Sequence, residues 1–246
     1  MSINRIMNKK ITLSILLMLS TTALSAQDSA MKLGVRLGGG ISVSKDMGKV
    51  LVPEDYYSNY EFKDKMQVIP SIGVYAHYHK AGSLFGADGG IVYYQKASKL
   101  HYADNMELNY DVTTRYSHLG VEGMFRFYPW RKGFSVSAGG RVSAILNPKG
   151  LRYESNQEDE KFASFAYGSA SETERIMRDK LTGRPDVAIG GGLGYEFGHW
   201  LIDARYFYGV TSGIKTELND FNWIDRNIHS HNIELSVSYL FDLGGF

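Results

Sequence analysis

The sequence predicts an all-β fold: an eight-stranded antiparallel up-and-down transmembrane β-barrel of the outer-membrane type, preceded by a signal peptide. Three observations predict it. Apolar residues alternate with polar residues and glycine along eight segments, short and long connections between these segments alternate, and aromatic residues gather near the segment ends. Together they indicate a sheet that is closed on itself and has lipid on its outside.

The composition excludes several other classes of protein. The chain of 246 residues has 27 Gly and 17 Tyr but no Cys, so it forms neither a disulfide scaffold nor a thiolate metal site. Its 27 Lys and Arg nearly balance its 26 Asp and Glu. This balance leaves no basic footprint of the kind that binds nucleic acid, and we expect no nucleic-acid partner.

Residues 1–26 have the three parts of a secretory signal peptide. Arg5, Lys9 and Lys10 supply the positive region, residues 11–19 the apolar region, and residues 21–26 the small-residue end. We predict cleavage after Ala26, which leaves residues 27–246 as a single outer-membrane β-barrel domain. An N-terminal membrane anchor is the alternative, but the apolar run is well short of the about 20 residues that a spanning helix needs.

The alternation that defines the strands begins at Leu33, after which the odd positions are apolar or glycine as far as Val43. A period of two residues is typical of a strand with one apolar face. The same pattern recurs seven times, with outward faces that begin at Val68, Phe85, Leu119, Phe134, Val187, Trp200 and Ile233. We predict strands near residues 32–44, 66–80, 84–96, 112–128, 134–146, 186–197, 200–210 and 230–243.

The connections between the predicted strands distinguish a membrane barrel from a soluble protein. Three of them are short, at residues 79–83, 129–133 and 198–199, and they alternate with long ones at 45–65, 97–111, 147–185 and 211–229. Outer-membrane barrels have short turns on the periplasmic side and long loops outside. A soluble sandwich has no reason for this order, and a secreted ligand-binding barrel, the remaining alternative, would point its apolar faces inward.

Aromatic side chains support the membrane barrel, because amphipathic rings prefer the interfaces of a bilayer. Eight of them lie within a few residues of the predicted short turns. We predict that they form an aromatic girdle made of Tyr78, Phe85, Phe127, Trp130, Phe134, Phe197, Trp200 and Phe241.

Charged residues occupy the faces opposite to the apolar ones and are therefore predicted to line the lumen. This lumen charge network consists of Arg36, Asp88, Glu122, Arg126, Arg141, Glu196, Asp203, Arg205 and Glu234. Because an eight-stranded barrel is only wide enough for its own side chains, these charges should pair with one another and leave a packed polar lumen. We expect Arg205 to pair with Asp203 or Glu234.

Two motifs that resemble catalytic or cofactor sites do not fit their chemistry. The glycine-rich run at residues 189–198 has no helix after it, as a dinucleotide site requires. His229 and His231 share the outward parity of Ile233 while Ser230 faces inward, so nucleophile and base do not converge. We expect no catalytic, metal or cofactor residues and no enzymatic activity. A rim-sited lipid-modifying or hydrolytic enzyme and a narrow passive channel remain alternatives.

The long connections are the places where a partner could bind. A short helix is predicted at residues 172–181, with Ser171 as its N-cap. Aromatic residues stand among charges in two of these connections. They are Tyr56, Tyr57, Tyr60 and Phe62 in the first and Phe162, Phe165 and Tyr167 in the other. Such rings either contact a partner or pack on their own loop.

Three segments give the chain a resemblance to a known family. They are SHLGVEGMFRFYP at residues 117–129, GFSVSAGG at 133–140 and, most specifically, ARYFYGVT at 204–211. Over roughly residues 33–243 the chain resembles the PorT-like outer-membrane β-barrel domain family. The resemblance implies an integral outer-membrane protein of a Gram-negative bacterium, in contact with outer-membrane lipid. It also implies envelope or secretion-system proteins as partners through the long loops, since PorT itself acts in type IX secretion.

Overall fold

The computed structural model of the chain describes residues 30–45, 60–104, 107–156, 169–216 and 229–243. Eight long strands form its main sheet: β1 (Met31–Ser44), β2 (Tyr60–His79), β3 (Phe85–Asp104), β4 (Asn109–Phe127), β5 (Phe134–Ile145), β8 (Asp186–Phe197), β9 (Trp200–Gly209) and β11 (Ser230–Asp242). The predicted signal peptide lies outside the described residues, as do the loop aromatics at residues 56, 57, 162, 165 and 167.

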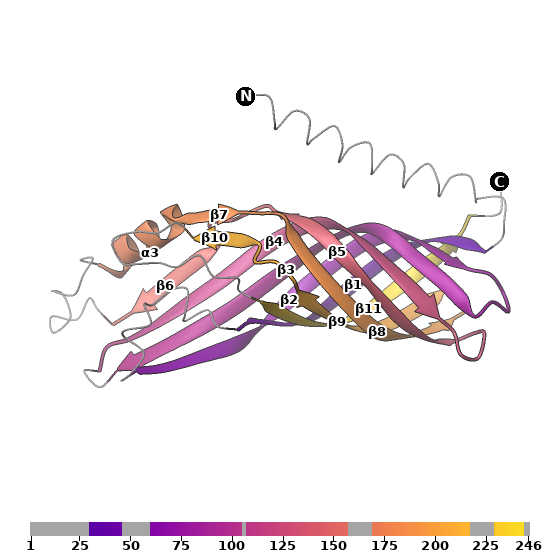
Figure 1. Cartoon of the computed structure of the whole chain (residues 1–246), viewed down its shortest axis with the longest axis horizontal. Coiled ribbons are helices and arrows are strands. Elements are labelled where there is room, and N and C mark those ends of the chain that lie inside the picture. Colours follow the sequence, from indigo (N-terminus) through magenta and orange to yellow (C-terminus); the bar gives the residue numbers. More distant parts are fainter. Residues whose placement is uncertain (1–29, 46–59, 105–106, 157–168, 217–228, 244–246) are drawn as a thin grey trace, which may run out of the picture.

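The eight strands close into an antiparallel barrel (Figure 1). The first strand, β1, pairs with the last, β11, from Lys32 opposite Asp242 to Ser44 opposite Ser230. Closure removes both sheet edges, so the backbone needs no water along the wall of the barrel. The structure therefore confirms the predicted eight-stranded up-and-down barrel.

Three short turns mark one end of the barrel, which we call the short-turn end; the opposite end is the long-loop end. The turns join β2 to β3, β4 to β5 and β8 to β9. The tightest is Gly198-His199, where Gly198 has a φ of +59°, a left-handed conformation that glycine adopts without steric cost. In outer-membrane barrels the short turns face the periplasm, which places the long-loop end outside the cell.

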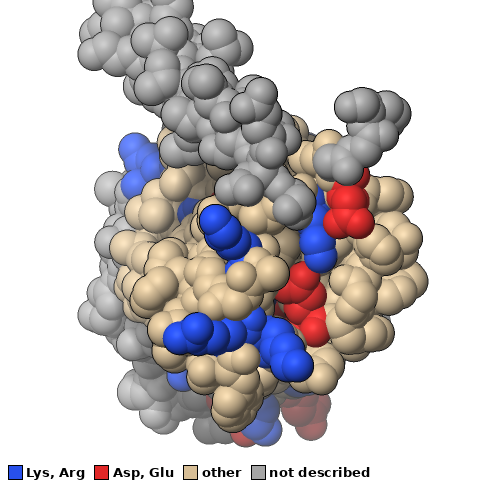
Figure 2. All heavy atoms as spheres, turned by 90° about the vertical axis from the view of Figure 1, so that its right-hand side faces the viewer, with Lys and Arg blue, Asp and Glu red and all other residues tan. Residues whose placement is uncertain are grey.

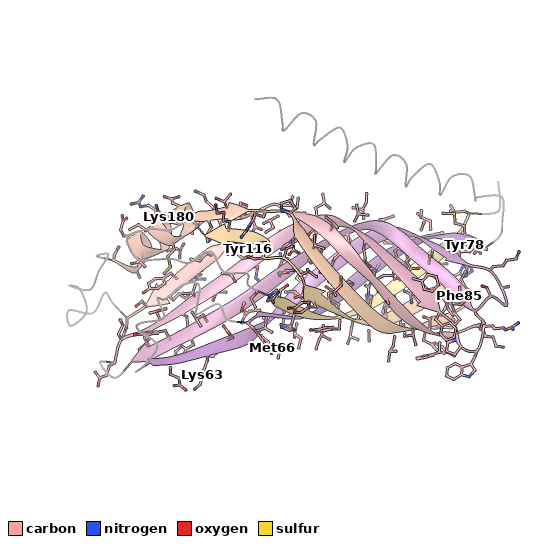
Figure 3. All side chains as sticks on the ribbon, viewed as in Figure 1. Lys63, Met66, Tyr78, Phe85, Tyr116 and Lys180 are labelled. Atoms are coloured by element: carbon pink, nitrogen blue, oxygen red, sulfur yellow. The ribbon has the colours of Figure 1, made fainter. Side chains whose placement is uncertain are left out.

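The barrel has an apolar exterior and a charged interior, the reverse of a soluble protein. Among the outward side chains, Leu37, Val68 and Leu235 are 63%, 72% and 62% exposed. Inside, the Arg126 and Arg141 side chains are at most 2% exposed. So much uncovered apolar surface is stable only against lipid. Figure 3 shows Tyr78 and Phe85 at the short-turn end of this belt and Met66 toward the other end.

Strands β2, β3 and β4 are longer than predicted. The expected boundaries at 66, 96 and 112 are wrong because pairing continues past them, to Tyr60 opposite Asp104 between β2 and β3 and to Ala103 opposite Asn109 between β3 and β4. The segment 97–111, predicted as a long loop, is therefore mostly the far end of a hairpin that extends beyond the apolar belt.

Four small elements accompany this extension: β6 (Leu151–Ser155), α3 (Ala170–Asp179), β7 (Leu181–Gly183) and β10 (Ile214–Thr216). The predicted N-cap of the helix, Ser171, is wrong by two positions. Ser169 has the extended backbone of a cap and its Oγ accepts a hydrogen bond from the Glu172 amide, so Ser169 and Glu172 have the spacing of a capping box. Within the described residues, no helix is long and apolar enough to cross a membrane.

The inside-out pattern predicts how lipid-facing charges affect stability. Leu235 lies at the middle of β11, so Leu235→Arg should lower the free energy of unfolding in lipid vesicles by about 2–4 kcal/mol. Met66 lies near the edge of the belt, and Met66→Arg should cost only about 0–1 kcal/mol. Urea unfolding followed by tryptophan fluorescence measures both variants. Equal losses would contradict the placement of the bilayer.

Candidate functional site in the barrel lumen

The structure turns all nine residues of the lumen charge network into the barrel. They come from seven of the eight barrel strands: Arg36 on β1, Asp88 on β3, Glu122 and Arg126 on β4, Arg141 on β5, Glu196 on β8, Asp203 and Arg205 on β9, and Glu234 on β11. Eight of them are no more than 7% exposed, and the Glu196 side chain is 12% exposed. Figure 2 looks onto the short-turn end, where acidic and basic side chains surround the mouth.

Arg126 organises the layer of the lumen nearest to the short turns. Its Nε donates to Asp88 Oδ2 at 2.6 Å, and its two terminal nitrogens donate to the two carboxylate oxygens of Asp203 at 2.8 Å each. A planar guanidinium fits a carboxylate in this two-pronged way. One buried cation thus holds carboxylates from two different strands, β3 and β9.

Glu122 is the centre of the next layer. Its Oε1 accepts hydrogen bonds from Arg36 at 2.9 Å and from Arg205 at 2.6 Å. The predicted pairing of Arg205 with Asp203 or Glu234 is wrong, although Glu234 lies directly opposite Arg205 in the strand register. The long arginine side chain instead reaches across the lumen from β9 to β4, because Asp203 is already held by Arg126.

Arg141 belongs to the third layer, closer to the long-loop end. It donates to Glu234 Oε1 at 2.5 Å. Its guanidinium also lies between two aromatic rings, 4.0 Å from the Tyr94 centroid and 3.6 Å from the Phe207 centroid. Two ring faces stabilise a cation that has lost its water.

Sequence reasoning missed several inward groups that complete these layers. Lys96 pairs with Asp186 at 2.7 Å, His77 Nδ1 lies 2.6 Å from Asp88, and Lys32 pairs with Glu196 at 3.1 Å. Their strand parity is that of the predicted network, which is the signal that could have found them. Adding Lys32 and Lys96 to the four predicted arginines gives six fixed cations in the described lumen. Adding Asp186 to the five predicted acids gives six carboxylates. Formal charge therefore balances.

Glycine leaves the space that these large side chains occupy. At Gly194, a methyl group in place of the α-hydrogen would lie 2.6 Å from both Arg126 Nη1 and Asp203 Oδ1. This is closer than atoms pack in proteins, so an alanine would displace the ion pair. The inward glycines are thus part of the packing of the lumen.

A small cavity lies at the long-loop mouth and has a volume of about 50 Å³. Its polar lining comes from Ser44, Lys96, Thr114, His118, Asp186, Thr211, Ser212 and Ser230. This volume holds only a few water molecules. Ser230 faces the cavity, whereas His231 Nδ1 is 2.7 Å from the hydroxyl of the outward Tyr206. The serine and its neighbouring histidine therefore lie on opposite faces of β11.

The aromatic residues predicted to form a girdle lie around the short-turn end. Seven of the eight are at least 37% exposed, and Phe134 is half-buried beside Trp130, with ring centroids 5.3 Å apart. Phe85 and Phe127 also contact each other across β3 and β4. A ring of exposed aromatics at one edge of an apolar belt is typical of the lipid interface.

A closed eight-stranded sheet with an apolar outside and paired charges inside defines an integral β-barrel protein of the Gram-negative outer membrane.

Comparisons with solved structures find distant similarities. Neisserial surface protein A has 12% identity and a TM-score of 0.39, and the match covers 84% of this chain and 96% of that chain. The outer membrane protein OprG from Pseudomonas aeruginosa has 14% identity and a TM-score of 0.36, over 85% of this chain and 96% of that chain. Ail, the attachment invasion locus protein of Yersinia pestis, has 14% identity and a TM-score of 0.35, over 85% and 98%.

No protein-family model matches the sequence, and no curated protein matches it significantly. The class of this protein therefore rests on its own sheet topology and on the distribution of apolar and charged side chains.

The layered lumen predicts unequal losses from two arginine substitutions. Arg126→Ala leaves Asp203 buried without a cation and should cost about 3–5 kcal/mol of unfolding free energy. Arg205→Ala should cost less, because Glu122 keeps its bond to Arg36. Both losses are measured from the ratio of folded to unfolded bands on heat-modifiable gels, for each variant over a range of urea concentrations. A larger loss for Arg205→Ala would contradict the observed pairing.

Proposed function

We propose that this protein is a PorT-like, non-enzymatic outer-membrane barrel that is closed to ions and presents an ordered extracellular surface to another envelope or secretion-system protein. The observation that carries the proposal is the extension of β2, β3 and β4 beyond the apolar belt, where they support a hydrophobic core of their own (Figure 1). We call this part the platform; it comprises residues 60–65, 97–104, 107–116, 149–155, 169–183 and 214–216.

The platform begins where the polarity of the two strand faces inverts. On β3, the inward face changes from the charged Lys96 to the apolar Leu100, while the outward face changes from Ile91 to Lys99. On β4, which runs in the opposite direction, the outward face changes in the same way from the lipid-facing Leu119 to Arg115 on the platform side. Apolar side chains that turn away from the outside are typical of a sheet surrounded by water, which supports a platform that stands outside the bilayer.

The platform core joins the small elements β6, α3, β7 and β10 to strands β3 and β4. Seven of its side chains are buried: Leu100, Val112, Leu151, Tyr153, Met177, Leu181 and Ile214. Helix α3 adds Met177 to this core, and its Glu174 accepts a hydrogen bond from the Tyr153 amide at 3.0 Å. A surface that is ordered before binding loses less entropy when a partner docks.

The exposed side of the platform is charged. On α3, Arg175 forms an ion pair with Glu172, and Arg178 pairs with Glu174 at 3.1 Å. The hydrogen bond from Arg175 lowers the pKa of Glu172 below its usual value. Lys149, Arg152, Glu154 and Lys180 add further charges nearby, and Figure 3 shows Lys63 and Lys180 at this end. Such a surface favours a polar partner and salt-dependent association.

The resemblance to PorT-like proteins supports the same proposal from the sequence side. Its most specific segment, residues 204–211, covers the end of β9 and the two residues after it, and turns Arg205 and Phe207 into the lumen and Tyr206 outward. This segment therefore contributes to the packed barrel. A role in secretion would depend on the platform, the described part of the chain that extends beyond the apolar belt at the long-loop end.

Site-specific photo-crosslinking in living cells tests the partner. A photoreactive residue in place of Arg152 or Arg175, both exposed on the platform, should give a discrete crosslinked band with one envelope protein. The same residue in place of Lys132, which is exposed in a short turn, is the control and should not give that band. Identical products from both ends, or no product from the platform at any salt concentration, would refute a platform partner.

Planar-bilayer recording tests closure of the lumen. Because buried ion pairs fill the three layers of the barrel, the purified protein should give no steady conductance steps, while an open porin in the same bilayer does. Stable, reproducible steps that scale with salt concentration would instead support the narrow channel.

A further inference from the structure

Three metal-ligating side chains converge at the short-turn mouth of the lumen. His77 and His79 stand at the end of β2, and Glu196 stands at the end of β8, on the opposite side of the ring of strands. One donor atom from each lies within 4.8 Å of the other two. From this arrangement we propose a binding site for a divalent transition-metal ion of the Zn²⁺ type, formed by His77 Nε2, His79 Nδ1 and Glu196 Oε2.

The distances between the donor atoms fit such an ion. Glu196 Oε2 is 3.5 Å from His77 Nε2 and 3.4 Å from His79 Nδ1. Two ligands at ordinary zinc bond lengths in a tetrahedral site are separated by about 3.3 Å. These two distances need shifts of only a few tenths of an ångström, and because His77 and His79 offer donor atoms within 4.8 Å of each other, the ion would draw the two imidazoles together.

In the neutral tautomers that protonate the nitrogen facing away from the site, both histidines turn a lone pair toward it, and an ion there would replace the present contact of His79 Nδ1 with Glu196 Oε2 at 3.4 Å. His77 Nδ1 lies 2.6 Å from Asp88 Oδ1, which places the proton on Nδ1 and leaves Nε2 as the ligand atom. His79 Nε2 lies 3.2 Å from the Ser83 carbonyl, which leaves Nδ1 as the ligand atom. The His79 ring also stacks on Tyr128 at 3.6 Å. In metal sites a carboxylate or carbonyl behind each ligating imidazole usually accepts its N–H and so fixes the orientation of the ring.

A buried nitrogen of the cluster makes only a long contact. The His77 side chain is 0% exposed, and among the described residues its Nε2 makes no hydrogen bond and has Glu196 Oε2 3.5 Å away. A buried nitrogen without a good hydrogen bond costs free energy, and a bound cation would supply a shorter, stronger interaction. The other oxygen of Glu196 accepts from Lys32 at 3.1 Å, so Oε2 remains directed at the histidines, with the Tyr128 hydroxyl 3.4 Å away.

The donor set selects the ion. Two imidazoles and one carboxylate suit Zn²⁺ and leave its fourth position for water, whereas Mg²⁺ and Ca²⁺ prefer oxygen ligands alone. The site lies at the mouth that Figure 2 shows, and the side chains of His79 and Glu196 are 9% and 12% exposed. An ion from the periplasm thus reaches it. Once bound, the ion joins β2 to β8 across the lumen. Binding of this ion does not depend on a partner of the platform at the other end.

Metal titration of the intact chain tests the site. Protein purified from outer membranes in detergent, without a polyhistidine tag and freed of metal by a chelator, is titrated with Zn²⁺ against a chromophoric chelator. We expect one saturable Zn²⁺ per chain and no saturable site for Mg²⁺. His79→Gln and Glu196→Gln should each weaken binding by about tenfold or more, and Asp88→Asn, which acts by positioning His77, by about 10–100-fold.

His199→Gln is the matched control, because His199 lies at the same end but bonds to the Leu240 carbonyl outside the cluster. It should bind Zn²⁺ like the wild type. Heat-modifiable gel mobility checks that each variant is folded. X-ray absorption of the Zn²⁺-loaded wild type needs no variant and should show two imidazole ligands. Absence of saturable binding, a different ligand set, or unchanged affinity in folded His79→Gln and Glu196→Gln would overturn the proposal.

Discussion

Every part of this structure depends on one constraint: the charges inside a narrow barrel must be neutralised by each other. Eight strands enclose an interior only as wide as the side chains that fill it, and the wall faces lipid, so an unpaired charge finds water on neither side. The six cations and six carboxylates of the described lumen meet this constraint by forming layers. The apolar exterior is stable only because the interior satisfies its own polar groups.

Most of the arginine ion pairs in the described lumen cross it, and Arg126 with Asp88 is the pair that joins neighbouring strands, β4 and β3. Glu234 lies opposite Arg205 on the neighbouring strand, and Glu122 lies opposite Arg141. Neither of these two pairs of opposite residues forms an ion pair. Arginine side chains are long enough to cross to a strand three places away in the ring. Each cross-lumen bond ties distant parts of the wall together, so the layers oppose flattening of the barrel in a way that neighbour pairs would not.

The sequence was sufficient for the barrel because a period of two residues is a direct record of which face meets lipid. Alternation placed Leu235 outside and Glu234 inside, and the structure agrees for both. It was insufficient for the platform. Beyond Lys96 the alternation continues, but the apolar residues move from the outward face to the inward face. In the sequence this change looks like the end of a membrane strand. Pairings such as Arg205 with Glu122 were out of reach, because parity gives the face of a residue and not the direction of a long side chain.

The two ends of the barrel are coupled through the same strands. Strands β2, β3 and β4 each run from the short turns to the platform, with one register shift between β2 and β3 at Met66 to Ser71. In the membrane they carry His77, Asp88 and Arg126, whose bonds hold the layer at the short-turn end. A platform that loosened at its base would have to break pairing in strands that the lumen layers fix. The packed lumen therefore makes the barrel a rigid support, and the platform takes its orientation from strands anchored by buried ion pairs.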